Sequence, residues 1–131
     1  MKKTTLLNKE ISEVIAGMGH LDTLVVADAG LPIPEHVRRI DLAVSRGIPA
    51  FADVVKAIES ELKVQRVVVA EEMGQVSPHV RKAIDQLFAG IPVEQVPHEQ
   101  FKKLCQNARA VVRTGECTPY ANVILESGVI F

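Results

Sequence analysis

Apolar residues recur along this chain with two periodicities that alternate from one segment to the next. In some segments they return every three or four residues, which places them on one side of a helix. Between these segments, β-branched and other apolar residues run together or alternate with polar ones, which is typical of strands. The helical pattern predicts helices within residues 8–18, 51–62, 78–88 and 97–108. The second pattern predicts strands at residues 23–27, 39–44, 64–70, 91–96, 110–112 and 121–125.

Residues with special backbone preferences mark several of these boundaries. Asn8 is suited to cap the first helix, and Gly19 stands where a helix commonly ends in a left-handed residue. Ser77 and Pro78 give a cap followed by proline in the first helical turn. Because strands alternate with helices, we expect an α/β fold, layered α/β/α with a largely parallel central sheet. No linker or repeat divides the chain, so residues 1–131 are predicted to form a single domain.

Composition and charge argue against two classes of partner. The chain is 47% hydrophobic and 24% charged, with a formal net charge of −1, as in ordinary globular proteins. No strong field would attract nucleic acid or an anionic membrane. The apolar runs are shorter than the roughly 20 residues of a membrane helix. Asn8, Lys9 and Glu10 interrupt the apolar stretch behind Lys2 and Lys3, so no export segment is expected. The expectation is therefore no nucleic acid and no membrane.

Metal and cofactor sites also find no support in the sequence. Cys105 and Cys117 lack a paired spacing, which favours a reduced, cytoplasmic compartment and no structural zinc. Glu71, Glu72 and the four histidines lack a spacing that would gather metal ligands. The glycine-rich nucleotide motifs GxGxxG and GxxxxGK[ST] are absent. We expect neither metal nor cofactor.

Two polar residues stand at the ends of predicted elements in the first third of the chain. Asp28 follows an apolar strand, and in α/β folds ligands bind beyond the carboxyl ends of strands. It could equally be a turn former, but the rigid loop at residues 30–34 favours a site. His20 lies in a junction, where a histidine taken alone is more often a cap or surface residue. His36 and His79 lie in polar contexts and are interpreted as solvated.

Two further pairs stand out by their spacing. His98 and Lys102 are four residues apart on a predicted helix, so they share one side of it, beside its apolar stripe. That side could face a cleft or a subunit contact, or be a solvated basic edge. Tyr120 and Asn122 are two residues apart and would face the same way in a strand. They could form a hydrogen-bonding wall for a hydroxylated ligand, although a surface strand edge would look the same.

Three motifs together resemble those of the D-ribose pyranases. They are Gly-His-x-Asp at 19–22, Asp-Ala-Gly-Leu-Pro at 28–32 and Gly-Glu-x-x-Pro-Tyr-Ala-Asn at 115–122. The resemblance includes the segment from His98 to Lys102 and covers essentially the whole chain. Leu21 departs from the pattern, because a polar residue is expected beside the histidine of the first motif.

This resemblance implies a cofactor-independent isomerase that interconverts the pyranose and furanose forms of D-ribose. Such an enzyme would supply the furanose that ribokinase phosphorylates after import. The family assembles into rings, here expected to be a pentamer or decamer, with each sugar site at a junction between subunits. The resemblance implies that His20 is the catalytic acid. The implied substrate-binding residues are Asp28, His98, Tyr120 and Asn122, to which Lys102 is added as a further candidate.

The expected mechanism is acid–base opening and closing of the sugar ring. An imidazole can give and take protons near neutrality, so His20 would protonate the ring oxygen. This requires His20 to share a pocket with Asp28. Three alternatives stay open: an L-fucose-type mutarotase, a non-catalytic sugar-binding subunit, and a phosphatase-like hydrolase with Asp28 as nucleophile. The hydrolase usually has a second acid two residues further on, where this chain has Gly30.

Overall fold

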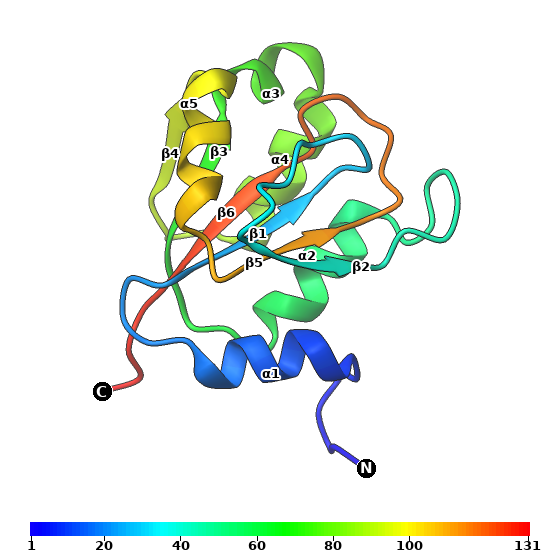
Figure 1. Cartoon of the computed structure of the whole chain (residues 1–131). Helices are drawn as coiled ribbons and strands as arrows, with labels where there is room; N and C mark the ends of the chain where they lie inside the picture. Colours follow the sequence, from blue (N-terminus) through cyan, green and yellow to red (C-terminus); the bar gives the residue numbers. More distant parts are fainter.

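The chain is built around one six-stranded sheet, seen in a computed structural model that describes residues 1–131. The strand order is β2-β5-β1-β6-β3-β4 (Figure 1). The strands are β1 (Thr23–Ala27), β2 (Arg38–Asp41), β3 (Val64–Ala70), β4 (Val93–Val96), β5 (Ala110–Arg113) and β6 (Val123–Ser127). Strand β6 runs antiparallel to β1 and β3, and all other pairs are parallel. The predicted largely parallel sheet is confirmed, with one antiparallel strand at its centre.

Helices cover both faces of this sheet. They are α1 (Lys9–Gly17), α2 (Phe51–Glu59), α3 (Glu71–Val76), α4 (Pro78–Leu87) and α5 (His98–Leu104), which continues as a 3₁₀ turn over Cys105–Asn107. The larger apolar core joins one sheet face to α1, α2 and α4, whereas the smaller core joins the other face to α5. In Figure 1, α5 crosses the near face of the strands, and α2 and α4 lie behind them. The predicted α/β/α layering is confirmed.

Strand β1 shows how the sequence pattern produces these layers. Leu24 and Val26 point into the larger core, and Val25 and Ala27 point into the smaller one. Successive side chains of a strand face opposite sides of the sheet, so a strand covered on both faces has an uninterrupted apolar run. All four side chains are fully buried. The strand bounds predicted from this run agree with the structure.

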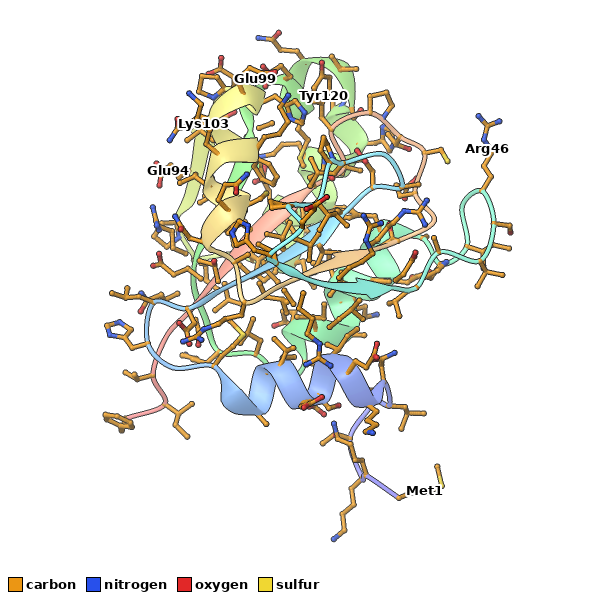
Figure 2. The ribbon with its side chains drawn as sticks, viewed as in Figure 1. Met1, Arg46, Glu94, Glu99, Lys103 and Tyr120 are labelled. Atoms are coloured by element: carbon orange, nitrogen blue, oxygen red, sulfur yellow. The ribbon has the colours of Figure 1, made fainter.

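Other boundaries differ from the prediction for local reasons. Helix α3 was not expected, because Met73 is its one buried residue and a single apolar side chain gives no periodicity. Strand β2 ends at Asp41, and residues 42–50 form a loop from whose tip Arg46 extends away from the molecule (Figure 2). Helix α1 ends at Gly17, and Met18 after it has an extended backbone. The left-handed residue of this junction is Leu21 and not Gly19. None of the helices is long and apolar enough to cross a membrane.

Candidate functional site

Asp28 and Asn122 form a hydrogen-bonded pair at the carboxyl end of β1. The Asn122 Oδ1 atom accepts the Asp28 backbone N–H at 2.8 Å, and Asn122 Nδ2 donates to Asp28 Oδ2 at 3.0 Å. The other carboxylate oxygen of Asp28 accepts the Gly30 N–H at 2.9 Å. Asp28 is therefore a turn former and a member of a polar cluster at the same time. The structure brings this predicted pair together.

Strand pairing explains why residues 94 positions apart meet here. Strands β1 and β6 are antiparallel neighbours with Val26 opposite Val123. Continued by one residue, this register places Asn122 opposite Ala27, the last residue of β1, and therefore next to Asp28. Asn122 is almost completely buried, and its amide uses both its oxygen and its nitrogen on Asp28. This fixes the orientation of the Asp28 carboxylate.

His98 and Tyr120 form a second pair next to the first. Their ring centroids are 5.0 Å apart with an interplanar angle of 82°, an edge-to-face contact. His98 is the first residue of α5, and its backbone N–H donates to both Glu72 carboxylate oxygens, at 3.2 and 3.0 Å. Figure 2 shows Tyr120 near the end of α5 that carries Glu99. His98 Nδ1 is buried without a hydrogen-bond partner, which is unusual in native proteins.

The expectation that Tyr120 and Asn122 share one face of a strand is wrong. Both precede β6, and Tyr120 has a left-handed backbone with φ of 62°. The Asn122 N–H donates to the Tyr120 carbonyl oxygen at 2.8 Å, which closes a tight turn. The turn sends the tyrosine ring towards α5 and the asparagine amide towards β1. The two residues still belong to one cluster, because the turn holds both pairs together.

A hollow of about 390 Å³ opens beside Asp28, within the range of small-molecule sites. It is lined by residues 28–30 and 116–119. Hydrogen bonds brace its two walls against each other: the Ala29 N–H donates to the Glu116 carbonyl oxygen at 2.8 Å, and Arg113 Nε donates to the Ala29 carbonyl oxygen at 3.0 Å. Glu116 Oε1 also accepts the N–H of Phe51 at the start of α2. The shape of the hollow is therefore fixed by the sheet and by α2.

Glu72 and Glu116 were not among the predicted site residues. Glu72 holds the first turn of α5, and Glu116 holds a wall of the hollow. Glu72 is the second residue after strand β3, and Asp28 is the first residue after β1, so an acidic residue close to a strand's carboxyl end is the signal that could have identified it. No three His, Cys, Asp or Glu side chains gather in an arrangement that could hold a metal ion.

His20 lies at the opposite edge of the sheet from this cluster. It precedes β1 whereas Asp28 follows it, and the five residues of β1 span about 16 Å. Within one copy of the chain, His20 and Asp28 do not share a pocket, because β1 carries the chain from one edge of the sheet to the other. The expected shared pocket would have to form between copies. His20 is exposed, and its Nε2 atom lies 3.1 Å from Gln65 Oε1.

A second hollow lies at the His20 edge. Its volume is about 500 Å³, and it is lined by residues 18–20, 61–63 and 127–131 together with Ile15. Ile130 and Phe131 at the end of the chain are fully or almost fully exposed. The chain thus has one hollow at each end of β1, with His20 at one and Asp28 at the other.

Lys102 is not joined to the cluster by any hydrogen bond or ion pair. Its Nζ atom pairs with Glu99 Oε1 at 2.8 Å, one helical turn earlier on α5. His98 instead contacts Phe101 and Tyr120 with its ring. A role for Lys102 in binding substrate stays a prediction.

Comparison with known proteins extends over nearly the whole chain. The profile of the RbsD / FucU transport protein family matches residues 1–130. A D-ribose pyranase of Chloroflexus aggregans is 58% identical over 131 residues, which is 100% of both chains. The structure of Bacillus subtilis RbsD complexed with D-ribose has a TM-score of 0.97 at 44% identity, covering 100% of both chains. A fucose mutarotase of Streptococcus pneumoniae shares the fold, with a TM-score of 0.81 at 23% identity and 100% of both chains covered. This chain therefore belongs to the RbsD / FucU transport protein family.

Proposed function

We propose that this chain is a D-ribose pyranase, an isomerase that interconverts the β-pyranose and β-furanose forms of D-ribose. The observation that carries the proposal is the cluster of Asp28, Asn122, His98 and Tyr120, of which Asp28 lines a hollow of suitable size. A carboxylate, an amide, an imidazole and a phenol offer mixed donors and acceptors, which suit a neutral polyol. Full-length relatives that carry this activity in their names support the same substrate.

Each half of the reaction, opening and closure, needs two proton transfers, and neither needs a redox step. When the pyranose opens, the bond from C1 to the ring oxygen breaks, the ring oxygen gains a proton, and the anomeric hydroxyl loses one. Closure to the furanose follows when the C4 hydroxyl attacks C1, loses its proton and returns one to the carbonyl oxygen. In this proposal His20 gives the first proton, and the Asp28 carboxylate takes the anomeric one. His98, Tyr120 and Asn122 hold the remaining hydroxyls. General acid–base catalysis contributes about 10²- to 10⁴-fold to a rate.

We infer that each active site takes His20 from one copy of the chain and Asp28 from a neighbouring copy. The two residues stand at opposite ends of β1, so head-to-tail contact between copies would bring one edge against the other. The exposed Ile130 and Phe131 provide apolar surface at the His20 edge for such a contact. Contacts of this kind close into a ring when the rotation between copies closes, as in the pentamer or decamer that the family resemblance implies. The rings would act in the cytoplasm and pass furanose to ribokinase.

The activity can be tested by magnetisation-transfer NMR on D-ribose. We expect the protein to accelerate exchange between ring forms, and His20→Ala to lower the acceleration by at least about 100-fold, the lower range for acid–base catalysis. His79→Ala, which removes an exposed imidazole of α4, is the matched control and should keep full activity. Absence of acceleration by the unaltered protein would refute the proposal that it is an enzyme. Full activity of His20→Ala would refute only the role of His20. The same measurement on L-fucose separates the two sugar specificities.

The shared site can be tested by mixing two inactive variants. His20→Ala and Asp28→Asn should each be nearly inactive alone. In mixed rings assembled by co-expression, some junctions combine the intact His20 of an Asp28→Asn copy with the intact Asp28 of a His20→Ala copy. For equal, random mixing, about a quarter of the junctions would be intact, so activity should return to about a quarter of the normal value. No return of activity in rings shown by mass spectrometry to be mixed would contradict the inference.

A further inference from the structure

His20 is the end of a hydrogen-bonded network that runs across two neighbouring strands, β3 and β6. Its Nε2 atom lies 3.1 Å from Gln65 Oε1, and Gln65 Nε2 donates to Glu126 Oε1 at 2.9 Å. The second oxygen of Glu126 accepts from Arg66, at 3.2 Å from Nε and 2.6 Å from the terminal nitrogen. Glu126 is buried in the sheet, and Arg66 is its cross-strand neighbour. Each side chain of this network is therefore hydrogen-bonded to the next one.

The charge on Glu126 fixes the direction of all the hydrogen bonds. The hydrogen bond from Arg66 holds the pKa of Glu126 below its usual value, against the opposing effect of burial. An ionised carboxylate only accepts hydrogen bonds, so the NH₂ group of Gln65 has to face it. The carbonyl oxygen of Gln65 then faces His20. An oxygen in this place can only accept, so the ring atom facing it must carry a hydrogen.

We propose that Gln65 and Glu126 are positioning residues that keep a hydrogen on Nε2 of His20 and leave Nδ1 as the atom that exchanges a proton with the sugar. This rests on the proposed function. The doubly protonated ring gives its Nδ1 hydrogen to the ring oxygen as the bond to C1 breaks. It is then the neutral Nε2–H tautomer, in which Nδ1 is free to take a proton back. The Nε2–H bond to Gln65 is kept throughout, so the ring does not reorient between the two transfers.

Glu126→Gln gives the sharpest test, because it should reverse the donor and acceptor roles along the hydrogen-bonded network. Arg66 still needs an acceptor, so the oxygen of the new amide must face Arg66 and its NH₂ group must face Gln65. Gln65 then turns its oxygen to this NH₂ group and its own NH₂ group to His20. The facing ring atom Nε2 must now accept, which moves the hydrogen to Nδ1. We expect the Nδ1–H tautomer in this variant, and kcat reduced by about 100-fold because the proton cycle is broken.

The tautomer is measured by ¹⁵N NMR of the histidine rings at a pH where they are neutral. The His20 signals are identified by their loss in His20→Ala. Because no sugar is present, this measurement stands or falls independently of the proposed function. Gln65→Met, which keeps the length of the side chain without hydrogen bonds, should give a mixture of tautomers. Its kcat should fall about tenfold with little change in KM, since the sugar contacts are untouched.

Glu94→Gln is the matched control. Glu94 is the other carboxylate paired with Arg66, but it does not contact Gln65. This variant should keep the Nε2–H tautomer and the normal kcat. The proposal is overturned if the unaltered protein has the Nδ1–H tautomer, or if folded Glu126→Gln and Gln65→Met both retain the Nε2–H tautomer. A changed tautomer with unchanged kcat would overturn the assignment of Nδ1 as the exchanging atom. If Glu126→Gln fails to fold, Gln65→Met decides alone.

Discussion

Leu21, the residue after His20, has a backbone conformation that does not suit its side chain. Its φ is 70°, and the side chain is 58% exposed, so little packing compensates. In the left-handed region Cβ crowds the backbone, and asparagine tolerates this region better than leucine. This explains in physical terms why a polar residue is expected at this position. The backbone N–H of Leu21 donates to the Ser127 carbonyl oxygen at 2.9 Å, which helps to hold this conformation.

Replacing this leucine should therefore stabilise the protein. We expect Leu21→Asn to raise the free energy of unfolding by about 0.5–1 kcal/mol, which is a part of the energy that a left-handed backbone conformation costs a residue such as leucine. Leu7→Asn is the matched control, since Leu7 is equally exposed but has no positive φ. Urea unfolding measures both. Equal effects of the two changes would show that loss of an exposed apolar side chain, and not backbone strain, is responsible.

Among the site residues, the position of Asp28 could be predicted from the sequence, but its contact with Asn122 could not. The position of Asp28 after an apolar run is local information. The way in which Asn122 reaches it depends on the pairing of β1 with β6, which no local pattern specifies. For the same reason, the spacing of Tyr120 and Asn122 predicted a shared strand face where the structure has a turn.

At the scale of elements, the loop that carries the third motif is anchored through Gly115. A Cβ atom at this position would lie 2.3 Å from the Ile48 carbonyl oxygen and 2.5 Å from that of Ser45. The Gly115 N–H donates to the Pro49 carbonyl oxygen at 3.0 Å, so the two loops are held at backbone distance. Only glycine fits between them. The loop at residues 42–50 therefore supports the wall of the Asp28 hollow.

Gly115→Ala should affect both stability and sugar binding. Because the clash is with backbone, the loops must separate, at a cost of about 1–3 kcal/mol. The wall would move away from Asp28, so KM for D-ribose should rise. Gly74→Ala is the control: nothing lies within 4 Å of its added Cβ, and within α3 alanine should gain about 0.5–1 kcal/mol. Thermal unfolding and the exchange assay measure these effects. A tolerated Gly115→Ala would contradict the tight contact.

The elements themselves were predictable in proportion to their apolar content. Strands β1 and β3 were located to the residue, because each is a continuous apolar or β-branched run. Helix α3, with one buried residue, was missed. The antiparallel direction of β6 could not be foreseen, since a fully buried strand has the same pattern in either direction.

At the scale of the whole molecule, ion pairs connect the edges of the sheet to the loops around them. Asp22, before β1, accepts the Gly19 N–H at 2.8 Å and pairs with Arg109 at 2.9 Å. The Gly19 hydrogen bond and the Arg109 partner hold the pKa of Asp22 below its usual value. The bond from Arg66 does the same for the pKa of Glu126. Both carboxylates are tied to the His20 edge.

These shifts predict a loss of stability in acid. A carboxylate with a lowered pKa in the folded state stabilises the fold at a pH above its unfolded pKa, which is about 4. That contribution disappears as the pH falls through the folded pKa. Stability should thus decline below about pH 4. Asp22→Asn should be less stable than the unaltered protein at pH 6 and should lose less on acidification, as measured by urea unfolding. Parallel pH profiles would contradict this origin.

The sequence by itself determined the α/β class, the main strands, and the identity of the polar residues beside the hollow, because these depend on local periodicity and on motifs. Only the tertiary structure decided how these residues are arranged. Strand β1 separates His20 from Asp28, and the antiparallel pairing of β6 brings Asn122 to Asp28 and Glu126 beside Arg66. Such contacts depend on strand order and direction, which are set by packing among distant segments and not by any single stretch of the chain.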